Sequence, residues 1–168
     1  MSSSFKKHST DLRASGFGLV EIVVVAGLLA ISGVAMMSAY NTILVNSLQS
    51  LYSTKAAFLA EEGLEAVRLL RDDGWSSNVA ALSSGTTYWP VFSTSTGRWQ
   101  AGTDPVFIDG LFERSFRLAD VYRNGDGDLA DTGALDSNAK KVTVSVSWRR
   151  GQATTTKTIT TYLTNLFE

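Results

Sequence analysis

An acidic run in the C-terminal half of this 168-residue chain holds the residues best suited to bind a metal. Oxygen-bearing side chains stand in it at Asn124, Asp126, Asp128, Asp131 and Asp136. Oxygen atoms at alternate positions are typical ligands of a hard cation such as Ca²⁺. The Asn-Gly and Asp-Gly pairs of the run also favour tight turns without any metal. The sequence therefore predicts either a calcium loop or a plain turn here, and it requires no other cofactor.

The acidic run resembles the first part of an EF-hand loop, but it departs from that pattern at two places. Leu129 stands where the pattern has its glycine, and Leu135 stands where it has the glutamate that binds through both oxygens. Asp136 follows one position late and could replace that glutamate. Calcium binding is thus one hypothesis, and the metal-free turn is the other.

The composition excludes several kinds of chemistry. The chain has no cysteine, which excludes disulfides, thiolate metal sites and a cysteine nucleophile. Its one histidine, His8, lies in the polar N-terminal segment, so a serine–histidine–aspartate triad in the folded body is excluded as well. The formal net charge of −1 provides no basic field for nucleic acid. We therefore expect a protein that is not an enzyme and that binds no nucleic acid.

A carboxylate near the start of a long apolar run is the second feature with chemical consequences. Residues 17–45 are uncharged except for Glu21, and a bilayer can be spanned by about 20 apolar residues. Lys6, Lys7 and Arg13 precede the run and no basic cluster follows it, which places the N-terminus in the cytoplasm. A charged side chain at the centre of a membrane costs about 3 kcal/mol, and less near the interface. A plain membrane anchor explains the length and the orientation of the run but gives Glu21 no role.

A secretory signal peptide is a poor explanation of the same run. Such a signal has an apolar stretch of about 7–15 residues followed by a small-x-small cleavage site. The run here is longer, and the one candidate site, at residues 37–39, is poor.

Residues 16–21, Gly-Phe-Gly-Leu-Val-Glu, resemble the processing site of type IV pilins and type II secretion pseudopilins. The short basic leader before them and the apolar helix after them belong to the same pattern. The resemblance implies that a prepilin peptidase removes the leader, residues 1–16, by cutting between Gly16 and Phe17, and that Phe17 is then N-methylated. It also implies that Glu21 becomes the fifth residue of the mature chain. Gly18 departs from this pattern, because the family more commonly has threonine or serine at that position. Some pseudopilins of the family bind calcium in a loop before the C-terminus.

A physical argument supports a role for Glu21 in assembly. Cleavage before Phe17 would expose an ammonium group four residues from Glu21. In a bundle of parallel helices, the glutamate of one subunit could neutralise the ammonium group of its neighbour, because a buried charge becomes tolerable when it is paired. The pair would also favour one axial register, as a buried polar residue does in a coiled coil.

One helix is expected to continue well past the apolar run. Small and apolar residues recur there at three- and four-residue spacing, which indicates one face of an amphipathic helix; they are Val45, Leu48, Tyr52, Ala56, Leu59, Gly63, Ala66 and Leu70. Gly74 can end this helix. Residues 17–45 would form the transmembrane and assembly half of the helix. Residues 46–168 would form the globular domain, helical to about 73 and β-rich afterwards.

The remaining sequence predicts an antiparallel sheet. Residues 111–122 and 141–149 alternate between apolar and polar side chains, and 154–163 is rich in threonine. Segments 88–92 and 98–100 are typical of two shorter strands around a turn. The predicted fold class is α+β, with one long N-terminal helix packed on an antiparallel sheet of three to five strands. The family resemblance implies the same pilin-like arrangement.

Together these features predict a structural subunit of a type IV pilus or a pilus-like filament, slightly in favour of a minor pilin. The subunit would cross the cytoplasmic membrane once and then polymerise through its N-terminal helix, in an extracellular pilus or an envelope-spanning pseudopilus. Expected partners are copies of itself or other pilins, the prepilin peptidase and a membrane-embedded assembly platform. One alternative is a pseudopilin of a type II secretion system. Another is an anchored module that binds calcium or a glycan. The glycan would bind at a patch lined by the four tryptophans Trp75, Trp89, Trp99 and Trp148.

Overall fold

The computed structural model describes residues 18–166 of the chain. The chain divides into two compact units, residues 1–47 and 48–168. The predicted cleavage site at Gly16 and Phe17, and the leader before it, lie outside the described residues.

The described part of the first unit is helical from Leu19 onward and belongs to α1 (Leu19–Asp72). Its first helical hydrogen bond is donated by the Ile22 amide to the Gly18 carbonyl, at 3.2 Å. Hydroxyl groups in the run bond back to the carbonyl four residues earlier, as Ser32 does to Leu28 at 2.8 Å and Thr42 does to Ser38 at 3.0 Å. This bonding satisfies them without water. By length and composition, α1 is long and apolar enough to cross a membrane.

The second unit begins within α1, and here the helix buries one face. The buried positions are Ala56, Leu59, Ala60, Gly63, Ala66, Val67 and Leu70. Five of the eight face residues that the sequence predicts are among them, while Leu48 stays exposed. The helix ends where the sequence predicts: Gly74 has a φ of 148°, which favours glycine, and the short α2 (Trp75–Asn78) follows.

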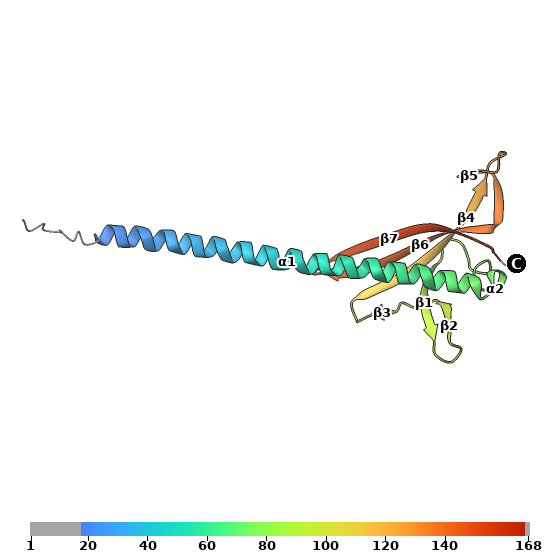
Figure 1. Cartoon of the computed structure of the whole chain (residues 1–168), viewed down its shortest axis with the longest axis horizontal. Coiled ribbons are helices and arrows are strands. Elements are labelled where there is room, and N and C mark those ends of the chain that lie inside the picture. Colours follow the sequence, from blue (N-terminus) through green and yellow to red (C-terminus); the bar gives the residue numbers. More distant parts are fainter. Residues whose placement is uncertain (1–17, 167–168) are drawn as a thin grey trace, which may run out of the picture. The chain divides into compact units, whose positions relative to one another are not determined.

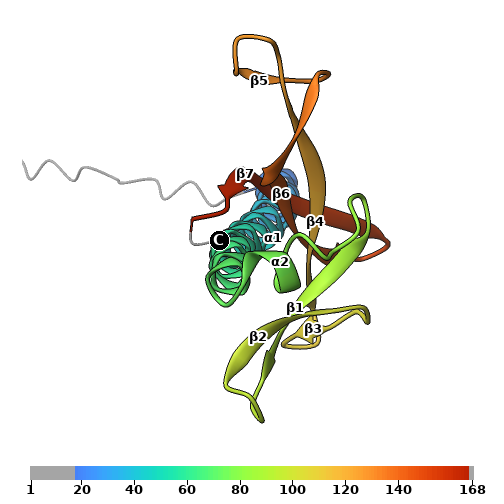
Figure 2. The same cartoon turned by 90° about the vertical axis from the view of Figure 1, so that its right-hand side faces the viewer.

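An antiparallel sheet forms the rest of the second unit (Figure 1). Its strands are β1 (Thr87–Ser93), β2 (Arg98–Gly102), β3 (Phe107–Ile108), β4 (Phe112–Arg123), β5 (Leu129–Ala130), β6 (Ala134–Arg150) and β7 (Ala153–Thr164). The order across the sheet is β2-β1-β4-β6-β7, and β3 and β5 each pair with an end of β4. Figure 2 shows how β1 and β2 continue the twisted sheet on one side of β4 while β6 and β7 lie on the other.

The α+β class is confirmed, but within residues 18–166 the sheet has seven strands and not three to five. The five strands of the main path include all the segments that the alternation predicts. The other two, β3 and β5, have two residues each, so they are too short to produce a periodic pattern. β6 also begins at Ala134, well before the alternating stretch from 141, because a register shift between Asp120 and Val121 of β4 lets its early residues pair with the end of that strand.

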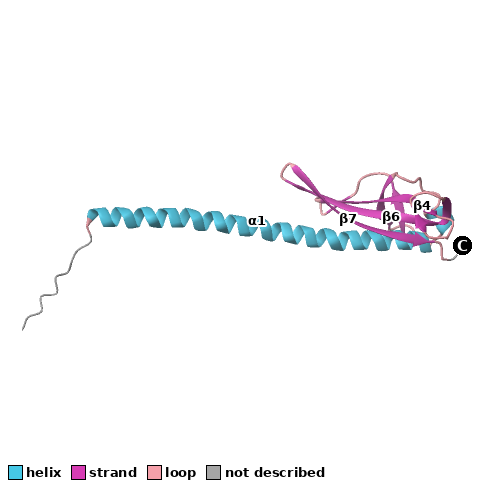
Figure 3. Cartoon of the chain, turned by 90° about the horizontal axis from the view of Figure 1, so that it is seen from above, coloured by secondary structure: helices cyan, strands magenta, loops and turns pink. Residues whose placement is uncertain are grey.

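The core of the second unit lies between the sheet and residues 48–72 of α1, which cover one face of it (Figure 3). On β4 the alternation predicted from the sequence is confirmed, because Phe112, Arg114, Phe116 and Leu118 are all buried. On β6 the buried residues are Val142, Val144, Val146 and Trp148. On β4, β6 and β7, the opposite face of the sheet carries mostly serine and threonine.

Candidate functional site

The apolar half of α1 carries the first group of candidate residues. Glu21 lies in the first turn of the helix, where the helix dipole favours a negative charge. It borders a shallow hollow lined by Ile22, Val25, Ala26 and Leu29. Within residues 18–166, Glu21 has no ion-pair partner. The side chains around Glu21 are exposed and apolar, so the site consists of one carboxylate on an exposed hydrophobic surface.

Small residues leave the surface of this half open. A Cβ placed on Gly27 or Gly33 would meet no atom within 4 Å. Glycines of this kind let a second helix approach closely in an apolar setting. The apolar half of α1 can therefore pack against other helices as well as against lipid.

The acidic run forms a hairpin turn between β4 and β5. The Asn124 amide donates to the Asp128 carbonyl at 3.0 Å, and the Gly127 amide donates to the Asn124 carbonyl at 3.1 Å. The side-chain oxygen Oδ1 of Asn124 accepts two further bonds, from the amides of Asp126 at 3.0 Å and Asp128 at 2.8 Å. The predicted turn is thus present, and an Asx turn stabilises it.

Asp136 also has a partner within the protein. Arg123 Nε donates to Asp136 Oδ2 at 2.6 Å, and Arg123 Nη1 donates to the Gly127 carbonyl at 2.8 Å. The hydrogen bond from Arg123 holds the pKa of Asp136 below its ordinary value, and the Asn138 amide contributes to the same shift. One arginine therefore ties the acidic turn to the start of β6.

The five candidate calcium ligands are only partly brought together. Within residues 18–166, no three Asp, Glu, His or Cys side chains form a group that could hold a metal. Asn124 and Asp136 use oxygens for protein contacts, while Asp126, Asp128 and Asp131 are exposed. Calcium binding stays a prediction, and a metal bound by Asp136 would compete with Arg123 for that carboxylate.

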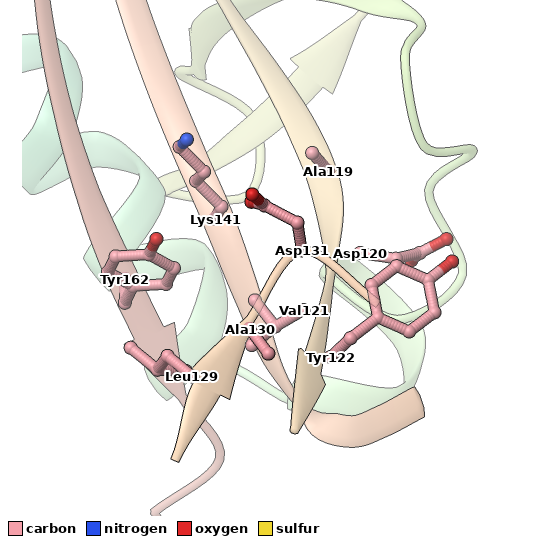
Figure 4. A pocket seen from close by; sticks show the side chains of 9 residues that line it. All are labelled: Ala119, Asp120, Val121, Tyr122, Leu129, Ala130, Asp131, Lys141 and Tyr162. Carbon is pink, nitrogen blue, oxygen red and sulfur yellow. The ribbon is translucent and has the colours of Figure 1, made fainter. Parts of the chain in front are cut away.

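A hollow of about 350 Å³ lies beside the acidic turn, on the sheet face away from α1. Figure 4 shows the side chains of Lys141 and Asp131 between β4 and β7, while those of Asp120 and Tyr122 lie beyond β4. Asp120 accepts a hydrogen bond from Lys140 Nζ at 2.5 Å and another from Ser84 Oγ at 2.7 Å. These two bonds, the one from Lys140 first, hold the pKa of Asp120 below its ordinary value.

Arg114, a buried arginine of β4, was not identified as a candidate residue from the sequence. Arg114 is 6% exposed, and its Nη1 lies 2.9 Å from Glu62 Oε2 and 3.3 Å from the Leu59 carbonyl. Its guanidinium also lies over the Trp99 ring, at 5.6 Å from the ring centroid. Its Nε is buried without a hydrogen-bond partner among the described residues. Arg114 could have been found from the sequence as a cation at an inward position of an alternating strand, because a buried charge is tolerated only when it is paired.

Comparisons of the chain with family models, with curated proteins and with solved structures give no match. The fold and the candidate residues are therefore interpreted from their own chemistry. What they define is an α+β protein whose N-terminal helix has an apolar, exposed first half and a packed second half.

Proposed function

We propose that the protein is a structural subunit of a type IV pilus or a pilus-like filament, processed by a prepilin peptidase and polymerised through α1. The observation that carries the proposal is the contrast between the two halves of this helix. Every described residue from 18 to 47 is exposed, although most are apolar, whereas the half after residue 48 buries one face. Each large aliphatic side chain left in water forgoes about 1.5–3 kcal/mol.

The exposed half needs an apolar environment, and Glu21 favours one made partly of other helices. Lipid alone would cover the aliphatic side chains, but it would leave the carboxylate without a counter-charge. A neighbouring subunit whose chain begins at Phe17 would bring an ammonium group to it. The unpaired carboxylate of Glu21 would thus be costly while the subunit is in the membrane, and pairing with the neighbour's ammonium group would remove that cost on assembly.

Mass spectrometry of the N-terminus of the native protein tests this proposal. We expect a chain that begins with N-methylated Phe17. The matched control is a Gly16→Val variant, which should keep its leader because the cleaved bond follows the glycine. An intact Met1 in the wild-type protein, or a chain that begins near Tyr40, contradicts the proposal.

A further inference from the structure

The hollow of about 350 Å³ beside the acidic turn is large enough to hold a small molecule. Ligand sites in proteins measure about 300–1,000 Å³, so this hollow lies at the lower end of that range. All of its lining residues lie between 119 and 162 in the chain and belong to the second unit. The site is therefore formed without any contribution from the apolar half of α1.

One row of three paired residues forms the floor of the hollow. Ala119 of β4 pairs with Lys141 of β6, and Lys141 pairs with Tyr162 of β7. Because the chain neighbours Leu118 and Leu163 are buried in the core, this row lies on the sheet face opposite α1. Ala119 has only a methyl side chain, so it leaves space beside Lys141 that a larger side chain would fill.

The charged residues of the lining are one paired aspartate, one lysine and one further aspartate. Asp120 is already neutralised by its ion pair with Lys140. Lys141 and Asp131 form no ion pair with each other or with any other residue in the described part of the chain. A ligand with a single charge would meet one of these two groups with the wrong sign, whereas a zwitterion satisfies both.

Backbone pairing sets the position of Asp131. This residue directly follows β5, and the two residues of β5 pair with the end of β4. Arg123 Nη1 also donates to the Gly127 carbonyl at 2.8 Å, within the turn that leads into β5. The carboxylate of Asp131 is therefore carried by a hydrogen-bonded hairpin, which holds it at the hollow.

Apolar surface adjoins the two unpaired charges. Leu129 is 50% exposed and Tyr162 is 48% exposed, and both line the hollow. In Figure 4 the side chains of Lys141 and Asp131 lie toward one end of the hollow, and that of Leu129 lies toward the other. This arrangement matches a small molecule that has both charges at one end and an apolar group at the other.

We propose that the hollow binds a free α-amino acid with an apolar side chain. Lys141 Nζ donates a hydrogen bond to the ligand carboxylate, and the ligand ammonium group donates one to the carboxylate of Asp131. Leu129 and the ring of Tyr162 contact the ligand side chain. The inference goes beyond the proposed function and does not rest on it, because the site needs only the folded second unit.

Nuclear magnetic resonance titration of the full chain, with leucine as the probe, tests the inference. A nonionic maltoside detergent and a buffer without divalent cations leave both charges of the hollow free. Two analogues each remove one charge of the ligand, since leucinamide lacks the carboxylate and N-acetylleucine lacks the ammonium group. We expect leucine to shift the backbone amide signals of Asp131, Lys141 and Tyr162. Leucine should also bind about two- to fivefold more tightly than either analogue, the factor expected for one exposed ion pair.

Two variants assign each ligand charge to its partner. In Lys141→Gln, leucine and leucinamide should bind equally, and in Asp131→Asn, leucine and N-acetylleucine should bind equally. The matched controls are Arg149→Gln, on the same face of β6, and Asp126→Asn, in the acidic turn. Both lie outside the lining and should keep the wild-type preference for leucine. All four side chains are exposed, so the variants should fold as the wild type does.

Each contrary outcome overturns the inference in a different way. If the wild type binds leucine and N-acetylleucine equally, the hollow is a site for carboxylate anions. If it binds leucine and leucinamide equally, the hollow is a site for amines. The absence of shifts at Asp131, Lys141 and Tyr162 up to the solubility limit of leucine shows that no amino acid binds. None of these results bears on processing at Phe17, which is measured separately by mass spectrometry.

Discussion

Arg114 of β4 lies directly against Gly63 of α1. A Cβ built on Gly63 would come within 2.9 Å of Arg114 Cδ and within 2.9 Å of Val144 Cγ1. The helix can approach the sheet this closely only because Gly63 has no side chain. The same approach brings the Arg114 guanidinium to the Leu59 carbonyl and to Glu62.

Gly63→Ala should therefore destabilise the second unit by about 1–3 kcal/mol, the usual cost of overpacking a core. Urea unfolding, followed by tryptophan fluorescence, measures this. The matched control is Gly33→Ala in the same helix, where the new methyl group meets no atom within 4 Å and should not lower this stability. If both variants unfold at the wild-type midpoint, the close approach is not needed for folding.

Removal of one member of the Arg114–Glu62 pair should cost more than replacement of both. Glu62→Gln leaves a guanidinium that is 6% exposed with weaker partners, and we expect a loss of about 1–2 kcal/mol, since Glu62 itself is half exposed. Arg114→Met, combined with Glu62→Gln, removes the buried charge and should recover part of that loss. A double-mutant cycle by urea unfolding measures the coupling. A double variant that is less stable than Glu62→Gln alone contradicts this expectation.

The stability of the sheet should fall in acid through Asp120. The hydrogen bonds from Lys140 and Ser84 lower the pKa of Asp120 in the folded protein below its ordinary value of 3.8. A lowered pKa means that the unfolded state binds the proton more readily. The stabilisation is therefore complete above about pH 4 and is lost as the pH falls through the folded-state pKa. Asp120→Asn should lower the free energy of unfolding near pH 7 and flatten its decline below pH 4.

Thermal unfolding between pH 7 and the acid range measures the effect of Asp120→Asn. Asp104→Asn is a suitable control, because Asp104 is exposed and has no ion-pair partner among residues 18–166. An acid profile of Asp120→Asn that coincides with that of the wild type refutes the assignment.

Glu21→Ala should leave membrane insertion intact but prevent incorporation into filaments. The variant removes a charge from an apolar segment, so insertion becomes easier by up to about 3 kcal/mol. It also removes the counter-charge for the N-terminus of a neighbour. Immunoblots of membrane and sheared-filament fractions measure the two steps. Glu61→Ala, an exposed carboxylate later in α1, serves as the control and should assemble normally. Normal filaments from Glu21→Ala would refute this role.

Calcium binding should be limited by the Arg123–Asp136 contact. The metal must compete with the arginine for the carboxylate, which is one of five predicted ligands. Arg123→Gln should therefore bind Ca²⁺ more tightly than the wild type, and Asp128→Asn should bind it more weakly. Calorimetric titration of the full chain measures both, with Mg²⁺ as the comparison ion. Equal affinities in the wild type and Arg123→Gln would contradict the competition by Arg123. No heat at millimolar Ca²⁺ in either protein would leave the plain turn as the explanation.

The acidic turn shows what a local sequence pattern can predict and what it cannot. Asn-Gly and Asp-Gly pairs predicted a tight turn, and the turn is present, because Asn124 bonds to amides only two and four residues away. That Asp136 pairs with Arg123 was not predictable, since the contact depends on β6 folding back along β4. The ligand spacing alone could not show that two of the five candidate ligands, Asn124 and Asp136, already bond within the protein.

The sequence by itself determined the periodic elements of this protein. Three- and four-residue spacing located the second half of α1, and Gly74 marked its end. Alternation located β4 and β6 with the correct inward faces, and the threonine-rich composition located β7. The same sequence placed one carboxylate, Glu21, in an apolar segment. These features depend on chain geometry over a few residues, so they can be read without knowledge of the fold.

Only the tertiary structure decided which distant residues meet. Arg114 and Leu59 are 55 residues apart in the chain, and Lys55 and Asp109 are 54 residues apart. Both contacts nevertheless join α1 to the sheet. The two-residue strands β3 and β5 exist because β4 offers them unpaired backbone groups, and not because of their own composition. Contacts of this kind depend on the packing of whole elements, which no short stretch of sequence encodes.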